Sequence, residues 1–288
     1  MTSAFSDRLV AAIRACGTPA CAGLDPVLER LPAGATGASP ADRFRAFGMG
    51  VIQAVTGILP AIKFQSACFE RHGASGLAVL HDLAAAAHAA GLVTILDAKR
   101  GDIGISAAHY AAAAWDAGFD AMTVSPYLGV ETLAAFLRPG RGLFVLVRTS
   151  NPESDSLQSA RLADGRSVAE LIADQVAAFG ARAQGNLGYS DVGVVVGATK
   201  AADAAALRTR MPRQFFLVPG FGAQGGTADD VRAMLDGRAD CGGGVLVTAS
   251  RSVIYPESSG LNSQRQWVPA VRRAALQLAE DVRNAVSA

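Results

Sequence analysis

The sequence predicts an α/β fold: a single (β/α)8 TIM barrel spanning residues 1–288, with an N-terminal helix and a long loop after strand five. Two observations predict this fold. Short β-rich runs alternate with Ala-rich helical stretches eight times along 288 residues, a length that is ordinary for one such barrel. The runs are mostly continuous in apolar residues, as expected for parallel strands covered on both faces.

The predicted strands occupy residues 19–25, 61–65, 92–99, 121–126, 143–150, 192–199, 215–222 and 244–252. A doubly wound open sheet is the alternative fold. The chain contains no Gly/Ser linker or repeat that would divide it. The polar stretch 151–167 is therefore interpreted as a long loop after the fifth strand and not as a domain boundary.

Local signals mark several helix ends. The first residues, "MTSAFSDRLVAAIRACG", have the periodicity of an amphipathic helix. Ser39 and Pro40 predict the N-cap and first turn of a helix that continues to residue 59, while Gly91 and Gly118 end two Ala-rich helices. The last segment, "QWVPAVRRAALQLAEDVRNAVSA", has apolar residues at helical spacing and predicts the final barrel helix.

Composition and charge exclude several classes of partner. Half of the residues are hydrophobic, and 26 basic side chains stand against 25 acidic ones, so no bulk field attracts a polyanion such as nucleic acid. Asp7 and Arg8 interrupt the pattern of a signal peptide, and no apolar run is long enough to cross a bilayer. We therefore expect a cytoplasmic protein that binds neither nucleic acid nor membrane.

The cysteines and histidines do not suggest a metal site. His81 and His88 lie seven residues apart in an Ala-rich helix without an evident third ligand, so we interpret them as surface or core-edge residues. The four cysteines have no close pairing and no zinc-type spacing, which indicates reduced thiols. They are Cys16, Cys21, Cys68 and Cys241.

Most of the predicted strands end in polar residues or glycine. In a barrel of this kind the carboxyl ends of the strands face the active site, so these residues are the candidates for chemistry. In strand order they are Asp25, Lys63, Asp97 with Lys99, Thr149 with Ser150 and Asn151, Gly220 to Gly222 with Gln224, and Ser250 with Arg251.

Two aspartates flank a lysine in "ILDAKRGDIG". Asp97 and Lys99 are two residues apart and are expected on the same side of their strand, whereas Asp102 falls on the following loop and could reach its own site or a neighbour's. With Lys63 on the adjacent strand, they could form an alternating array. Flanking carboxylates favour the ammonium form of Lys99, which suits a cation and proton donor and not a Schiff-base nucleophile. The alternative is a structural salt-bridge network at the barrel rim.

A second group of residues predicts a phosphate site. Glycines in "VPGFGAQGGT" follow the seventh strand, and "TASRS" ends the eighth. These are the positions where such barrels bind phosphate, through backbone N–H groups and here through the forked guanidinium of Arg251. A Gly-rich turn alone could be only a turn, but its occurrence together with Arg251 favours phosphate.

These residues resemble the orotidine 5'-phosphate decarboxylase family, particularly its longer bacterial branch, over about residues 18–256. The most specific element is the D-x-K-x-x-D signature, formed here by Asp97, Lys99 and Asp102. It is accompanied by Lys63 in "IKFQ", Asp25 in "GLDP", "TSNP" at 149–152, "PGFGAQGG" at 219–226 and "SRS" at 250–252.

The resemblance implies decarboxylation of orotidine 5'-monophosphate to uridine 5'-monophosphate and CO2, without metal or organic cofactor. Lys99 would stabilise the C6 carbanion and then protonate it. Asp97 and Lys63 would hold Lys99 and the ribose hydroxyls, and Asp25 would also bind ribose. Asp102 would come from the partner subunit and crowd the substrate carboxylate, which implies a homodimer. A carbanion without a cofactor as electron sink needs such preorganised positive charge.

The resemblance also assigns the remaining substrate contacts. Ser150 would bind the pyrimidine, Gln224 would bridge base and phosphate, and Arg251 with the Ser250 and Arg251 amides would grip the phosphate. Further substrate-binding candidates by position are Asn151, Pro219, Gly220, Gly222 and Ser106.

Two departures from the family pattern affect local geometry. Many members follow the signature with Ile-Pro-x-Thr, whereas this chain has Ile103, Gly104, Ile105 and Ser106. Ser106 keeps a hydroxyl, but Gly104 constrains the dimer-contacting loop less than proline would. After strand eight, a Gly-Arg pair is replaced by Ser250-Arg251, which retains the amide donors and adds a side chain near the phosphate.

Two other functions are considered. A sugar-phosphate enzyme of the same superfamily, such as a 3-keto-gulonate-phosphate decarboxylase or a hexulose-phosphate synthase, would use magnesium and a glutamate on strand two. Lys63 occupies that position and would repel the metal. A catalytically silent barrel that senses a pyrimidine nucleotide is the second alternative, since the fold alone does not imply catalysis.

Overall fold

The computed structural model describes residues 3–222, 225–256 and 264–287. Its strands form one closed barrel in the order β1 to β8, with every neighbouring pair parallel and β8 paired to β1. Each predicted strand overlaps an observed one. The predicted TIM barrel is therefore confirmed, and the doubly wound sheet is wrong. The strands are β1 (Ala20–Leu24), β2 (Ala61–Gln65), β3 (Val93–Arg100), β4 (Ala121–Val124), β5 (Gly142–Arg148), β6 (Val192–Val196), β7 (Phe216–Pro219) and β8 (Val245–Ala249).

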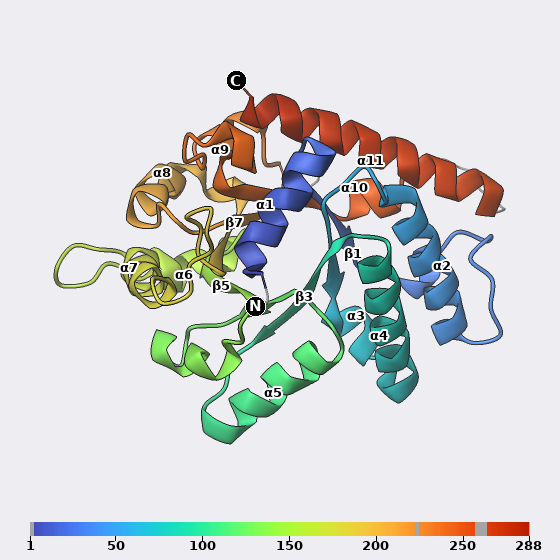
Figure 1. Cartoon of the computed structure of the whole chain (residues 1–288), viewed down its shortest axis with the longest axis horizontal. Helices are drawn as coiled ribbons and strands as arrows, with labels where there is room; N and C mark the ends of the chain where they lie inside the picture. Colours follow the sequence, from blue (N-terminus) through green and yellow to red (C-terminus); the bar gives the residue numbers. More distant parts are fainter. Residues whose placement is uncertain (1–2, 223–224, 257–263, 288) are drawn as a thin grey trace.

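Helices surround the barrel (Figure 1). The α-helices are α1 (Phe5–Cys16), α2 (Pro40–Val55), α3 (Ser66–Glu70), α4 (Gly73–Ala89), α5 (Gly104–Asp116), α6 (Asp155–Gln158), α7 (Val168–Gly180), α8 (Ala201–Arg210), α9 (Ala228–Arg232), α10 (Arg251–Ile254) and α11 (Gln264–Val286). Short 3-10 helices are η1 (Leu28–Arg30), η2 (Val130–Phe136), η3 (Pro152–Ser154), η4 (Ala198–Lys200) and η5 (Ala239–Gly244).

The start of α2 follows the predicted cap. The Ser39 hydroxyl accepts from the Asp42 amide at 3.2 Å, and the Asp42 carboxylate accepts from the Ser39 amide at 3.1 Å, which is a reciprocal capping box. The helix ends at Val55, short of the expected residue 59, because Gly57 takes a left-handed φ of 74°.

Helix α1 closes the amino end of the barrel. Figure 1 shows it lying across the barrel opening, and its apolar face belongs to the same core as the inward side chains of the strands. Phe5 packs edge-on against Phe144 of β5, with ring centroids 5.9 Å apart. Gly142 makes room for this contact, because a Cβ there would lie 2.2 Å from the Phe5 ring. Helix α1 thus fills the amino end of the barrel, opposite the end where the cavity described below opens.

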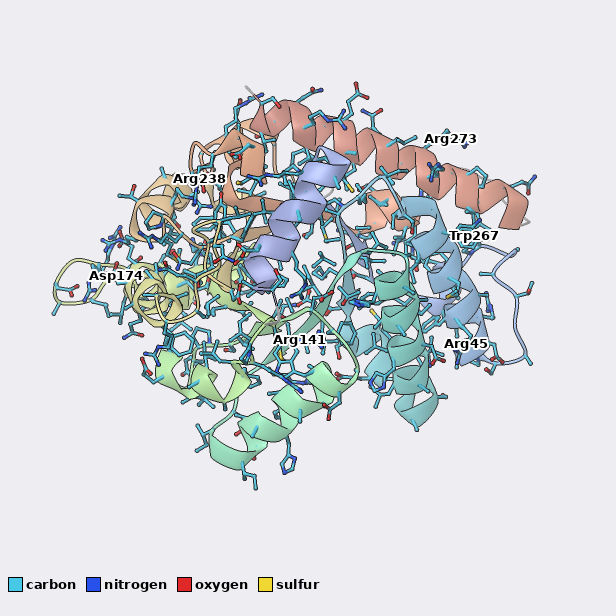
Figure 2. All side chains as sticks on the ribbon, in the orientation of Figure 1. Arg45, Arg141, Asp174, Arg238, Trp267 and Arg273 are labelled. Carbon is cyan, nitrogen blue, oxygen red and sulfur yellow. The ribbon has the colours of Figure 1, made fainter. Side chains whose placement is uncertain are left out.

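A second core lies between the strands and the outer helices. One of its contacts joins α11 to α2, where Trp267, labelled in Figure 2, packs on Phe47 with ring centroids 5.3 Å apart. Gly50 lies directly beneath the indole, because a Cβ at this position would approach it to 2.1 Å. The final segment is therefore a barrel helix, as predicted, with Pro269 inside it near its start.

Two connections differ from the simple strand-helix alternation. The segment after β4 carries the 3-10 helix η2 and not an α-helix, because Gly129, with φ 100°, and Pro139 leave only a short stretch between them. The predicted loop 151–167 is partly ordered, with η3, α6 and a β-bridge between Arg161 and Ser167.

Within the part of the chain that the structure describes, no helix combines the length and apolarity needed to span a membrane. All four cysteines are free thiols, as predicted from their spacing. Burial raises the pKa of the Cys21 thiol to about 12.

Candidate active site

A cavity of about 620 Å³ opens at the carboxyl ends of the strands. Every strand, or the loop that follows it, contributes to its lining. This location was predicted from the polar residues that end the strands. The predicted site residues that line the cavity are Asp25, Lys63, Asp97, Lys99, Ser150, Asn151, Pro219, Gly220, Ser250 and Arg251.

The cavity contains a chain of ion pairs centred on Asp97. Its Oδ2 lies 2.7 Å from the Lys63 ammonium, and its Oδ1 lies 2.6 Å from the Lys99 ammonium. Asp25 adds a longer contact of 3.8 Å to Lys63. Lys63 and Asp97 are buried, whereas the Lys99 side chain is 46% exposed and borders the open cavity. One face of the Lys99 ammonium is therefore available to a ligand.

The end of β3 is not a regular strand. Its register against β4 shifts between Leu96 and Arg100, and Lys99 takes a φ of 48°, which no other non-glycine residue does among those the structure describes. The Thr123 hydroxyl accepts from the Lys99 amide at 2.9 Å and donates to Asp97 Oδ1 at 2.9 Å. The bulge thus orients the Lys99 side chain toward Asp97. Regular strand alternation alone does not predict this irregularity.

The ion pairs change the titration of both buried partners. Burial alone would lower the pKa of Lys63, but the carboxylates of Asp97 and Asp25 outweigh it and raise that pKa. Burial alone would raise the pKa of Asp97, but the Lys63 and Lys99 ammonium groups hold it well below its ordinary value. Both groups are therefore charged at neutral pH.

Asp25 has unused capacity for a hydrogen bond. Its Oδ1 is buried and has no hydrogen-bond partner among the described residues. The Lys63 ammonium lies 3.8 Å from this oxygen, which is an ion-pair contact but too long for a hydrogen bond. A buried carboxylate oxygen without a hydrogen bond is costly, and Asp25 borders the cavity. A ligand hydroxyl would satisfy it.

Asp102 does not join the ion pairs of its own chain. Its Oδ1 accepts from the Ile103 amide at 2.8 Å, and the residue does not line the cavity. Ser106 is exposed on the first turns of α5 and does not line it either. A single chain therefore assembles Lys63, Asp97 and Lys99 but not the complete array of four.

The departure at Gly104 has a conformational counterpart. Gly104 takes a φ of 52°, whereas a proline ring fixes φ near −65° and could not adopt this conformation. The family's Ile-Pro pattern would therefore require a different backbone at the start of α5.

The ends of β7 and β8 bring glycines beside a short helix. Gly220 lines the cavity with a φ of 94°, while Gly222, with a φ of 68°, does not line it. Gln224 lies outside the described residues. Ser250 precedes α10 and packs so closely on β1 that a Cβ at Gly23 would lie 1.9 Å from its Oγ.

Several lining residues were not predicted. Thr123 is a polar residue within an otherwise apolar strand, and that contrast is the signal that could have revealed it. Gln158 pairs with Thr149 at the end of the β5 loop, with its Oε1 accepting from the Thr149 amide at 2.8 Å. No local sequence pattern predicts the hydrogen bond between Gln158 and Thr149. Among residues 3–222, 225–256 and 264–287, no group of three or more His, Cys, Asp or Glu side chains could hold a metal ion.

Residues 49–260 match the model of the family described as orotidine 5'-phosphate decarboxylase / HUMPS. The chain belongs to this family. A relative from Rhodopirellula baltica named orotidine 5'-phosphate decarboxylase is 39% identical over 97% of this chain and 99% of its own. One from Deinococcus radiodurans with the same name is 38% identical over 99% of both chains. The structure of Leishmania donovani OMP decarboxylase, 33% identical, superposes with a TM-score of 0.77 over 99% of both chains.

Proposed function

We propose that this protein decarboxylates orotidine 5'-monophosphate to uridine 5'-monophosphate and CO2 in pyrimidine biosynthesis. The observation that carries the proposal is the Lys99 ammonium, held by Asp97 at 2.6 Å beside a cavity of about 620 Å³, a volume within the usual range for small-molecule sites. Family membership and full-length relatives named for this reaction support it.

The proposed reaction leaves an electron pair at C6. The bond from C6 to the carboxylate breaks, CO2 departs, and the electron pair stays on C6. The Lys99 ammonium stabilises this charge and donates its proton to C6, and solvent then reprotonates the amine. Asp97 and Lys63 fix the ammonium in place before the charge develops, so no reorganisation is needed during the reaction.

The remaining contacts would orient the nucleotide. Asp25, whose Oδ1 has no hydrogen bond among the described residues, would accept from a ribose hydroxyl, and Ser150 would bind the pyrimidine. Gly220, Ser250 and Arg251 would hold the phosphate, whose remote binding energy helps to assemble the site. From the family resemblance alone, we propose that Gln224 contacts both the base and the phosphate.

We propose a homodimer in which Asp102 enters the partner's site. Asp102 lies outside its own cavity, next to Ile103 and Ile105, which are 60% and 75% exposed. Tyr127, on the loop after the neighbouring strand β4, is 77% exposed. Large exposed apolar side chains beside an incomplete site are explained if a second copy covers them and supplies the fourth charged group.

We also propose that the whole chain acts as one domain in the cytoplasm, which its four free thiols support.

The test is a continuous ultraviolet assay of the purified protein with orotidine 5'-monophosphate in excess EDTA, with the product identified by chromatography. Conversion to uridine 5'-monophosphate is expected. A folded protein that binds the nucleotide without turnover would instead support the silent sensor. If the protein neither binds nor converts the nucleotide, a sugar phosphate with magnesium becomes the substrate to assay, although Lys63 on β2 argues against that chemistry.

A further inference from the structure

Beneath the β5 loop lies a cluster of charges that the proposed chemistry does not use. Arg148, the last residue of β5, is 4% exposed. Its Nη2 lies 2.7 Å from Asp155 of α6, and its Nε lies 2.7 Å from Asp203 of α8. Lys200 approaches the same Asp155 oxygen at 2.6 Å. The guanidinium therefore connects the loop to the outer helix layer.

Burial of this arginine is not explained by stability alone. Burial by itself lowers the pKa of Arg148, but the hydrogen bonds to Asp203 and Asp155 outweigh it and raise that pKa, so the group is charged. Only the Arg148 side of these ion pairs is buried, because the Asp155 and Asp203 side chains are half-exposed. Ion pairs with exposed partners contribute little net stability, whereas they can fix geometry. The geometry fixed here is that of residues 149–158.

Residues 149–158 are closed on themselves. The Gln158 amide accepts from the Thr149 backbone at 2.8 Å and donates to its hydroxyl at 3.0 Å, which joins the two ends. The Ser154 hydroxyl donates to the backbone carbonyls of Asn151 and Thr149, at 2.7 and 3.2 Å. These internal hydrogen bonds give residues 149–158 a defined conformation along one side of the cavity.

Ser150 is held from the other side. Its carbonyl accepts from the Thr199 hydroxyl at 3.0 Å. Gly197, which follows β6, allows its segment to approach the β5 loop so closely that a Cβ there would lie 2.7 Å from the Ser150 Cα. The residue assigned to the pyrimidine therefore lies between the β5 loop on one side and the segment after β6 on the other.

We propose that Arg148 is a positioning residue, which anchors residues 149–158 through Asp155 and Asp203 as a fixed wall on the base side of the cavity. This inference rests on the proposed function, because the base contact belongs to that function. The phosphate contacts come from the ends of β7 and β8 and do not depend on this anchor.

The test uses Asp155→Ala, whose side chain is 52% exposed and does not line the cavity. The variant removes the contacts of Asp155 to Arg148 and Lys200, while Arg148 keeps Asp203 and its Nη1 hydrogen bond to the Ser154 hydroxyl at 3.3 Å. The matched control is Asp82→Ala, which breaks an ion pair to Arg45 at a similar exposure of 53%. Figure 2 places Arg45 on the outer helix layer, at α2.

Two ligands distinguish a loss of base contacts from a loss of phosphate contacts. Uridine 5'-monophosphate carries base, ribose and phosphate, and ribose 5-phosphate lacks the base. Asp155→Ala is expected to raise KM for orotidine 5'-monophosphate and Kd for uridine 5'-monophosphate by about tenfold. The expected change in kcat is below about threefold, and ribose 5-phosphate should inhibit within about twofold of its wild-type constant. Asp82→Ala should leave all four quantities unchanged.

A merely structural role would reduce the folded fraction, which lowers kcat and leaves KM and Kd unchanged. That result, unchanged binding of uridine 5'-monophosphate, or equal weakening of both ligands would overturn the inference. Arg148→Lys is a second variant that keeps the buried charge, and it should show the same selective loss for the nucleotide. Failure of the proposed function would differ, because the wild-type protein would then show no turnover.

Discussion

The Thr123 hydroxyl donates to Asp97 Oδ1 at 2.9 Å, on the same oxygen that holds the Lys99 ammonium. The same hydroxyl accepts from the Lys99 backbone amide at 2.9 Å, where the chain takes a left-handed φ of 48°. One side chain on β4 thus stabilises both an unusual backbone conformation and the carboxylate that orients the proposed proton donor.

Thr123→Val should lower kcat by about tenfold and cost roughly 1–3 kcal/mol in the free energy of unfolding, because a buried donor and acceptor lose their partner. Thr94→Val is the control. Thr94 is also buried, and it bonds Asp120 between β3 and β4, away from the cavity. It should cost similar stability in urea unfolding without changing kcat. Equal kcat values for the wild type and Thr123→Val would show that the Thr123 hydroxyl does not contribute to turnover.

The close approach of β1 to Ser250 predicts an effect at the phosphate side. A Cβ at Gly23 would meet the Ser250 Oγ at 1.9 Å, so Gly23→Ala must displace the residue that begins α10. Inhibition by uridine 5'-monophosphate and by ribose 5-phosphate should weaken together, each by about tenfold.

Gly50→Ala controls for that prediction, because its clash with Trp267 at 2.1 Å affects only helix packing. It should lower Tm and leave both inhibition constants unchanged. Retained ribose 5-phosphate inhibition in Gly23→Ala would contradict a phosphate role for the β8 end.

A shared active site predicts complementation between inactive variants. In a dimer of one Lys99→Ala chain and one Asp102→Ala chain, one site contains both wild-type groups and the other contains neither. Random mixing after unfolding and refolding should restore about a quarter of wild-type activity, because half of the dimers are mixed and each has one intact site. Verified mixed dimers without activity would place Asp102 outside the partner's site.

The ion pairs predict how stability depends on pH. The pKa of Asp97 is lowered in the folded state, so its contribution is present above the unfolded value of about 3.9 and is lost as the pH falls through the folded value. The pKa of Lys63 is raised, so its contribution is present below about 10.4 and is lost as the pH rises through the folded value.

Urea unfolding of the wild type and Asp97→Asn from acid to alkaline pH checks this dependence. The difference in the free energy of unfolding should be largest near neutral pH and should narrow below about pH 4. A constant difference across the acid range would mean that Asp97 does not titrate as the ion pairs require.

The features predicted from sequence are those that neighbouring residues determine. Strand ends, the Ser39 cap and the helix-ending glycines depend on short stretches of chain, and the barrel then gathers the strand ends at one mouth. The bulge at Lys99 was missed because it depends on Thr123, which is 24 residues away along the chain. The Arg148 anchor was missed for the same reason, since Asp203 is 55 residues away.

Asp102 illustrates a different limit. Its sequence position identifies it as part of the signature, but one chain places it outside the cavity that holds Lys99. In the proposed homodimer the role of Asp102 depends on a second copy, and neither the sequence nor the fold of one chain supplies that geometry.

The most direct test of the central claim compares Lys99→Ala with the wild type in turnover of orotidine 5'-monophosphate and in binding of uridine 5'-monophosphate. The account predicts that turnover falls by at least about 10⁴-fold, because proton donor and carbanion stabiliser are lost together. Nucleotide binding should persist, since the proposed ribose contact of Asp25 and the phosphate contacts come from other strands. Turnover that survives, or that falls only in step with binding, would contradict the role of Lys99.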